Sequence, residues 1–235
     1  MIRQERAKKI QKHLTREYPD PQCALKHKNA FQLLMATILS AQCTDTRVNM
    51  VTPGLFRRFS TPKAMAAADM EELMDLVRST GFYRNKSKSL IGAATRIVEA
   101  YRGRVPDTME DLLTLPGVAR KTANVILGTW FKKNEGVVVD THVQRLSRRM
   151  KLTRQTDPRK IEVDLMKLFP RKEWTNLSHR LILHGRGVCR ARIPRCDDCV
   201  LGAALCPSYE PDIARWKPKR PARKTTARKT AAKKS

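Results

Sequence analysis

The chain has 235 residues, of which 48 are Lys or Arg and 22 are Asp or Glu, and its formal net charge is +26. A charge of this size exceeds what solubility requires and indicates a polyanionic partner. No long basic amphipathic helix favours an anionic membrane, and the richest apolar stretch, 33–39, is too short to span a bilayer. The N-terminal sequence has no apolar signal core, so we expect a cytoplasmic protein, associated with the nucleoid if bacterial, that binds nucleic acid and no membrane.

Apolar periodicity predicts helices almost throughout the chain. Asn29 is placed to cap a very apolar helix that is buried on most sides, and Thr61 followed by Pro62 is typical of a helix start. Pro53 marks either a kink or an early end of the helix around it. The first five helices are expected at 4–18, 30–40, 44–59, 62–77 (continuous, or broken before 71) and 85–101.

The second half of the chain starts with two helical patterns, 108–114 and 120–131, on either side of a short break at Gly117. Residues 137–139 are three valines that resemble a strand, but the stretch is too short to build a sheet, so the predicted fold class is all-α. The basic segment 217–235 contains nine Lys or Arg and no acid, and we expect it to be disordered. The remaining helices are expected at 141–150, 158–169 and 173–184.

The break at Gly117 predicts a hairpin of two helices. Such a turn presents the first backbone N–H groups of the second helix, which suit a phosphate. Lys121 lies in the first turn of that helix and is either a solvated surface residue, a phosphate contact or a nucleophile. A free lysine is almost entirely ammonium at neutral pH, so we expect burial of the amine to favour its reactive, neutral form. Asp140 precedes the helix at 141–150 and could be only its N-cap.

Four of the six cysteines lie in one short segment, with a spacing typical of metal ligands rather than of a disulfide framework. Four thiolates within one loop suit either a [4Fe–4S] cluster or a structural zinc ion, and the spacing alone does not decide between them. We expect Cys23 and Cys43 to be free thiols. The four candidate ligands are Cys189, Cys196, Cys199 and Cys206.

Taken in order, these motifs make the chain resemble endonuclease III, a family of bifunctional DNA glycosylases and abasic-site lyases of the helix-hairpin-helix superfamily. The resemblance implies that Lys121 is the nucleophile and Asp140 the catalytic carboxylate. It also implies excision of oxidised or ring-fragmented pyrimidines from duplex DNA through a lysine Schiff base, with strand cleavage by β-elimination. The alternatives are a monofunctional mismatch or adenine glycosylase, against which Lys121 argues, and a DNA-binding homologue without turnover, against which the presence of both residues argues. The matching stretches, within about residues 1–210, are 39–42, 81–83, 115–124, 139–142, 181–186 and the cysteine segment.

The resemblance further implies a set of DNA-binding residues. Gln42 would fill the gap left by an everted nucleotide, unless it is an ordinary surface amide. Phe82 would replace the aliphatic wedge of the family, unless it is a core aromatic residue. His142 is either a pocket residue or a core histidine. The expected phosphate contacts are Gly117 and Ala119 in the hairpin and Arg190, Arg192 and Arg195 in the cysteine segment.

The implied architecture is two helical lobes with a DNA-binding cleft between them. One lobe spans 23–136 and ends with the hairpin. The other combines 1–22 with 137–209 and holds the iron–sulfur cluster, which the resemblance favours over zinc. The family's hairpin usually has a second glycine where this chain has Ala119, and alanine is strained there only if φ is positive. We expect a monomer that acts on double-stranded DNA containing damaged pyrimidines or abasic sites.

Overall fold

The computed structural model describes residues 1–211, so the predicted basic tail at 217–235 lies outside the described residues. Within 1–211 the protein is all-helical, as predicted, and the valines of 137–139 belong to an extended connection rather than a strand. No helix in this range is long and apolar enough to cross a membrane. The α-helices are α1 (Arg3–Glu17), α2 (Ala30–Leu39), α3 (Asp45–Arg58), α4 (Pro62–Ala66), α5 (Met70–Val77), α6 (Tyr83–Tyr101), α7 (Met109–Leu113), α8 (Arg120–Thr129), α9 (Thr141–Arg149), α10 (Pro158–Leu168), α11 (Trp174–Gly187) and α12 (Gly202–Leu205), with 3-10 turns η1 (Arg78–Thr80) and η2 (Arg171–Glu173).

Polar side chains at the N-terminal ends determine where many of these helices start. The Asn29 side chain accepts a hydrogen bond from the backbone N–H of Gln32 at 2.8 Å, as a cap of α2 should. Asp69 caps α5, so the continuous helix considered for 62–77 is wrong. Pro53 does not end α3, which continues to Arg58. The predicted helix starts at Asn29 and Thr61 are confirmed. Both could be predicted because a capping residue acts only on the first turn of its own helix.

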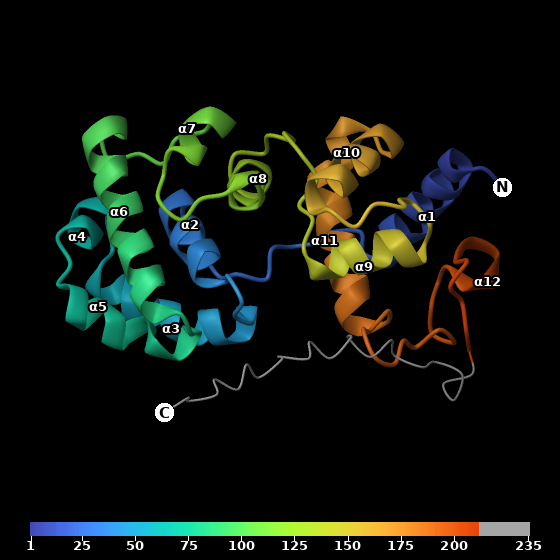
Figure 1. The fold of residues 1–235 in the computed structure, drawn as a ribbon, viewed down its shortest axis with the longest axis horizontal. Helices are drawn as coiled ribbons and strands as arrows, with labels where there is room; N and C mark the ends of the chain where they lie inside the picture. Colours follow the sequence, from blue (N-terminus) through green and yellow to red (C-terminus); the bar gives the residue numbers. More distant parts are fainter. Residues whose placement is uncertain (212–235) are drawn as a thin grey trace, which may run out of the picture.

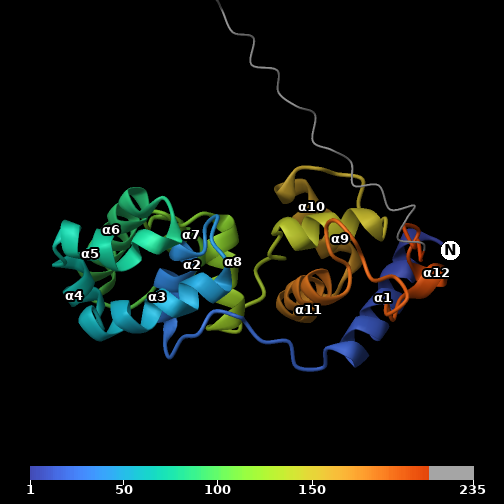
Figure 2. The same cartoon turned by 90° about the horizontal axis from the view of Figure 1, so that it is seen from below.

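Buried apolar side chains form two separate clusters. The first core contains residues of α2–α8, from Leu25 to Leu127. The second core contains α1 together with residues of α9–α12, from Val137 to Leu205. Figures 1 and 2 show the corresponding groups of helices side by side, with the chain crossing between them after α1 and again after α8. The division of the chain into lobes at residues 23 and 136 stays a prediction.

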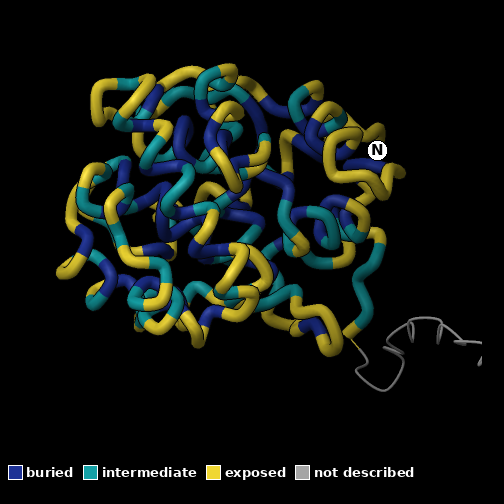
Figure 3. Tube along the Cα trace, turned by 60° about the vertical axis from the view of Figure 1, so that its left-hand side comes forward, coloured by how far each residue is buried: buried dark blue, intermediate teal, exposed yellow. Residues whose placement is uncertain are grey.

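Two of the helices, α8 of the first core and α11 of the second, lie against each other where the two groups meet. Gly128 allows this approach, because a Cβ atom there would lie 2.2 Å from Thr175 Oγ1. The helix α11 extends three residues beyond the predicted end at 184 and includes two glycines. A Cβ on Gly185 would lie 2.9 Å from His142 Nδ1, so the glycine is explained by close packing against α9 rather than by a helix end. In Figure 3 the buried segments run through the interior and exposed segments cover it.

Candidate active site and cysteine cluster

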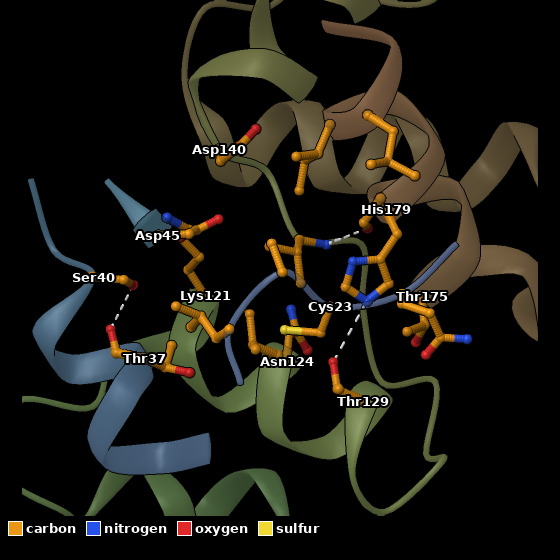
Figure 4. A pocket seen from close by; sticks show the side chains of 18 of the residues that line it. Cys23, Thr37, Ser40, Asp45, Lys121, Asn124, Thr129, Asp140, Thr175 and His179 are labelled. Carbon is orange, nitrogen blue, oxygen red and sulfur yellow. Dashed lines mark hydrogen bonds between the residues drawn. The ribbon is translucent and has the colours of Figure 1, made fainter. Parts of the chain in front are cut away.

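A pocket with about 760 Å³ of empty space lies between α8 and α11 (Figure 4). Its lining residues recur at helical spacing, so each helix contributes one continuous stripe to a wall. Both predicted catalytic residues, Lys121 and Asp140, line this pocket. The stripe on α8 comprises Lys121, Asn124, Val125 and Thr129, and the stripe on α11 comprises Thr175, Ser178, His179, Ile182, Leu183 and Arg186.

Lys121 lies at the mouth of the pocket in the first turn of α8. The preceding turn requires Gly117, whose φ is +77° and where a Cβ would lie 2.6 Å from the Ser89 Cβ. Ala119 has a φ of −101°, so the family's second glycine is not needed here. No side chain caps α8, which leaves its first N–H groups available to another partner. The protein alone does not bury Lys121 as expected: the residue is exposed although it lines the pocket.

Asp140 is both the N-cap of α9 and a wall of the pocket. Its Oδ1 accepts a hydrogen bond from the Val143 backbone N–H at 2.8 Å. This bond fixes the carboxylate at the start of the helix while the residue remains half-buried. Asp140 is therefore an N-cap, as one interpretation of the sequence predicted. The cap uses only one carboxylate oxygen, so the other oxygen can still take part in catalysis.

Two ion pairs connect the helices of the two cores, and the sequence analysis missed both. Asp45 on α3 pairs with Arg186 on α11 beside the pocket. Arg120 on α8 pairs with Glu162 on α10, through distances of 3.0–3.2 Å from Nε and Nη2 to the carboxylate. The partners are 141 and 42 residues apart in the chain. No local pattern links residues so distant, so only the tertiary structure reveals these pairs.

Two histidines near the pocket have environments that favour the neutral ring. Burial lowers the pKa of His179, and the positive charges of Lys132 and Arg186 lower it further. Its Nε2 lies 3.5 Å from Thr129 Oγ1. Burial also lowers the pKa of His142, against the opposing effect of Asp140. The His142 ring packs against Gly185 and lies outside the pocket lining, whereas His179 is a pocket residue that sequence analysis missed.

Gln42 and Phe82 are exposed and adopt left-handed backbone conformations, with φ of 52° and 49°. Such conformations are uncommon for residues other than glycine and often mark functional turns. Phe82 is 62% exposed, so the alternative of a core aromatic residue is wrong. The turn before it is held by Lys86, a buried lysine whose Nζ donates to the Thr80 carbonyl at 2.8 Å and whose pKa is lowered by burial.

The four clustered cysteines line one small cavity with about 390 Å³ of empty space. Burial, together with the charges of the other three thiols, raises the pKa of Cys206 to about 11. Within residues 1–211 no three His, Cys, Asp or Glu side chains are close enough to share a single metal ion. Arg149 Nη1 donates to Cys189 Sγ at 3.2 Å, and His184 Nε2 lies 3.4 Å from Cys199 Sγ. The thiols thus surround a common space rather than one point.

The predicted arginines of this segment are exposed and do not share one environment. Arg195 forms an ion pair with Asp198, and Arg190 Nε donates to the Gly187 carbonyl at 3.1 Å. Arg192 is exposed on the same loop. They add positive surface beside the cysteine cavity.

Comparison with known proteins identifies one family. The family model of the HhH-GPD superfamily of base excision DNA repair proteins matches residues 35–171. The endonuclease III of Synechocystis sp. is 55% identical over 208 residues, which cover 88% of this chain and 94% of the relative. The endonuclease III of Bacillus subtilis is 43% identical over 190 residues, covering 80% and 86%.

Solved structures are similar over the same range. A non-covalent endonuclease III–DNA complex gives a TM-score of 0.84 at 40% identity, covering 88% of this chain and 97% of the other. A trapped covalent endonuclease III–DNA intermediate gives the same values. A thermostable thymine-DNA glycosylase, at a TM-score of 0.77 and 18% identity, shares the fold.

Proposed function

Since the chain belongs to the endonuclease III family of helix-hairpin-helix base excision repair proteins, we propose that Lys121 is its Schiff-base nucleophile and Asp140 its catalytic carboxylate. Membership of this family makes the protein a DNA glycosylase and abasic-site lyase. The observation that carries the residue assignment is that Lys121 and Asp140, from the helices of different cores, line one pocket. The substrates proposed are oxidised or ring-fragmented pyrimidines, everted from duplex DNA into this pocket.

The chemistry uses the amine and the carboxylate in turn. The neutral amine of Lys121 forms a bond to the sugar C1′, and the damaged base leaves with the electrons of the glycosidic bond and takes up a proton. The Asp140 carboxylate stabilises the positive charge that develops on the sugar and helps to move protons. Opening of the sugar ring gives a Schiff base. Loss of a C2′ proton then breaks the C3′–O bond, so that the strand on the 3′ side leaves with a 5′ phosphate. Water hydrolyses the remaining Schiff base and returns the free lysine.

Because Lys121 is exposed in the free protein, its desolvation would come from the DNA that covers the pocket mouth. The uncapped N-terminus of α8 offers backbone N–H groups to a phosphate next to the lesion, with Gly117 and Ala119 forming the turn. Gln42 would occupy the space of the everted nucleotide, and Phe82 would wedge between bases. His142, Arg190, Arg192 and Arg195 are the remaining proposed DNA contacts, of which the three arginines lie on the loop of the cysteine cavity.

We further propose that the cysteine cavity holds a [4Fe–4S] cluster, ligated by Cys189, Cys196, Cys199 and Cys206. Four cysteine thiols that line one cavity are a donor set that suits an iron–sulfur cluster. Arg149 and His184 would support the cysteine sulfurs by hydrogen bonding. When bound, the cluster supplies cross-links that fold the loop carrying the arginines.

Borohydride trapping tests the nucleophile. We expect the wild-type protein to form a covalent adduct with lesion-bearing duplex DNA, and Lys121→Gln to form none while it still binds the duplex. Lys63→Gln, an exposed lysine on α4, is the matched control and should trap normally. An adduct of undiminished yield with Lys121→Gln would assign the nucleophile to another amine.

Metal analysis and colour test the cluster. Protein purified without oxygen should be yellow-brown and contain about four iron atoms per chain. Cys199→Ala should lose iron and unfold at a lower temperature, because metal binding is coupled to folding. A colourless, zinc-containing protein from iron-replete cells would contradict the proposal.

A further inference from the structure

Asn124 has a buried carbonyl oxygen with no hydrogen-bond partner in the active-site pocket. The residue is 4% exposed and lines the pocket one helical turn after Lys121 (Figure 4). Within residues 1–211, its Oδ1 is the one buried side-chain polar atom of the pocket lining without a partner. A buried acceptor left without a donor costs free energy, so the site is arranged for a donor that arrives from outside.

The orientation of the Asn124 amide is determined by its neighbours. Nδ2 donates to Glu162 Oε1 at 2.9 Å, and the same carboxylate is held by Arg120. A carboxylate paired with a guanidinium can only accept hydrogen bonds, so the amide NH₂ must face Glu162 and the oxygen must face away from it. Gly136 lies against both side chains, because a Cβ there would lie 2.0 Å from Glu162 Oε1, 2.5 Å from Asn124 Nδ2 and 3.0 Å from Asn124 Oδ1.

Other polar groups on the opposite wall already have partners. Thr175 Oγ1 donates to Asn134 Oδ1 at 2.7 Å. Ser178 Oγ accepts from the Val138 backbone N–H and donates to the Trp174 carbonyl, both at 2.9 Å. These two groups hold the wall together, whereas the buried Asn124 oxygen has no partner.

Asn124 follows Lys121 along the pocket wall that α8 provides. Three residues along an α-helix rise about 4.5 Å, so the backbones of Lys121 and Asn124 are about that far apart along the axis of α8. Ordinary covalent geometry places N3 of a pyrimidine about 4 Å from the sugar C1′. A nucleotide whose C1′ lies at the Lys121 amine, with its base directed along α8, brings N3 toward Asn124, the next residue of α8 in the pocket lining.

We propose that Asn124 Oδ1 accepts a hydrogen bond from the N3–H of the everted base, or from the equivalent ureido N–H of a ring-fragmented pyrimidine. Asn124 is then the residue with which the pocket recognises the base. The proposal rests on the function proposed above, in which Lys121 attacks C1′ of a nucleotide everted into this pocket.

The test compares three duplexes in single-turnover reactions: one with thymine glycol, one with its N3-methyl derivative and one with an abasic site. Methylation removes the donor, so wild-type protein should release the methylated base at least about tenfold more slowly. Asn124→Ala should release thymine glycol about tenfold more slowly than wild type and should lose most of its preference for the unmethylated base. Cleavage at the abasic site, which has no base, should stay within about twofold of wild type. Asn176→Ala, a half-buried asparagine of the neighbouring polar pocket, is the matched control and should behave as wild type.

Each other outcome overturns the proposal. Equal release of both bases by the wild-type protein excludes recognition of N3–H, and this result needs no variant. An unchanged preference in Asn124→Ala means that another group recognises the donor. An equal loss of base release and of abasic-site cleavage makes Asn124 a support for Lys121 or for the fold. If wild-type protein cleaves abasic sites but releases no thymine glycol, the proposed substrate class fails, and with it the proposal.

Discussion

The buried carboxylate of Glu162 is predicted to stabilise the contact between α8 and α10, and Glu162→Gln tests this. The side chain of Glu162 is 8% exposed and that of Arg120 is 40% exposed. In the Glu162→Gln variant, water can solvate the partly exposed guanidinium of Arg120. Loss of the ion pair itself therefore costs only about 0.5 kcal/mol of stability. The larger part comes from Asn124, whose buried Nδ2 competes with Arg120 for the single oxygen of a glutamine. An unsatisfied buried donor costs about 1–3 kcal/mol, and we expect a total loss of about 2 kcal/mol.

For a folded body of this size, such a loss lowers the melting temperature by roughly 4–8 °C. Thermal unfolding at neutral pH, followed by circular dichroism on protein with its metal content matched to wild type, measures the shift. Glu99→Gln makes the same chemical change at an exposed position of α6 and should leave the melting temperature within about 1 °C. Equal melting temperatures for Glu162→Gln and wild type would refute the reasoning, because the buried carboxylate would then contribute nothing.

Three further predictions concern the pocket and the tail. Asp140→Asn keeps an acceptor for the Val143 N–H, so stability should change by less than about 0.5 kcal/mol. Single-turnover base release should nevertheless fall by roughly 100-fold or more. Near-normal release would show that Asp140 acts only as a helix cap. The pKa of His179 is lower in the folded protein than in the unfolded chain, so the unfolded chain is protonated at a higher pH. Stability should therefore fall as the pH decreases below about 6.5. Urea titrations at about pH 5 and pH 7 should show a smaller difference in stability for His179→Gln than for wild type. Deletion of 217–235, which contains nine Lys or Arg, should reduce the slope of log K against log salt for undamaged DNA by about 0.9 for each phosphate that the tail neutralises, and an unchanged slope would mean that the tail neutralises none.

Local signals made much of the fold predictable from sequence. Asn29 and Thr61 mark helix starts because a cap acts within three residues of itself. Errors arose where a contact between distant segments overrides the local signal. The predicted helix stopped at residue 184, but α11 continues through Gly185, where α9 packs too closely for a side chain. The start of α6 was predicted two residues late because the left-handed Phe82 begins the helix from an unusual conformation.

The candidate site was predictable only in part. The order of motifs is sufficient to single out Lys121 and Asp140, and the structure places both at one pocket. The sequence could not reveal the proposed role of Asn124. That role depends on Glu162, which lies 38 residues away and accepts the hydrogen bond of the amide nitrogen. Exposure of Lys121 was also not predictable, because the direction of a side chain in the first turn depends on how the whole helix is docked.

The orientation of α8 about its own axis affects both the stability of the fold and the direction of the Lys121 side chain. Arg120 and Asn124 are one turn apart and bind the same carboxylate on α10, so together they fix which side of α8 faces the second core. Lys121 follows Arg120 by one residue, or about 100° around the helix, and that rotation directs it to the pocket mouth. Glu162 does not line the pocket, yet its removal would leave the direction of Lys121 less well defined. Lys121, the proposed nucleophile, is exposed and depends on such orientation, because no surrounding core holds its amine in place.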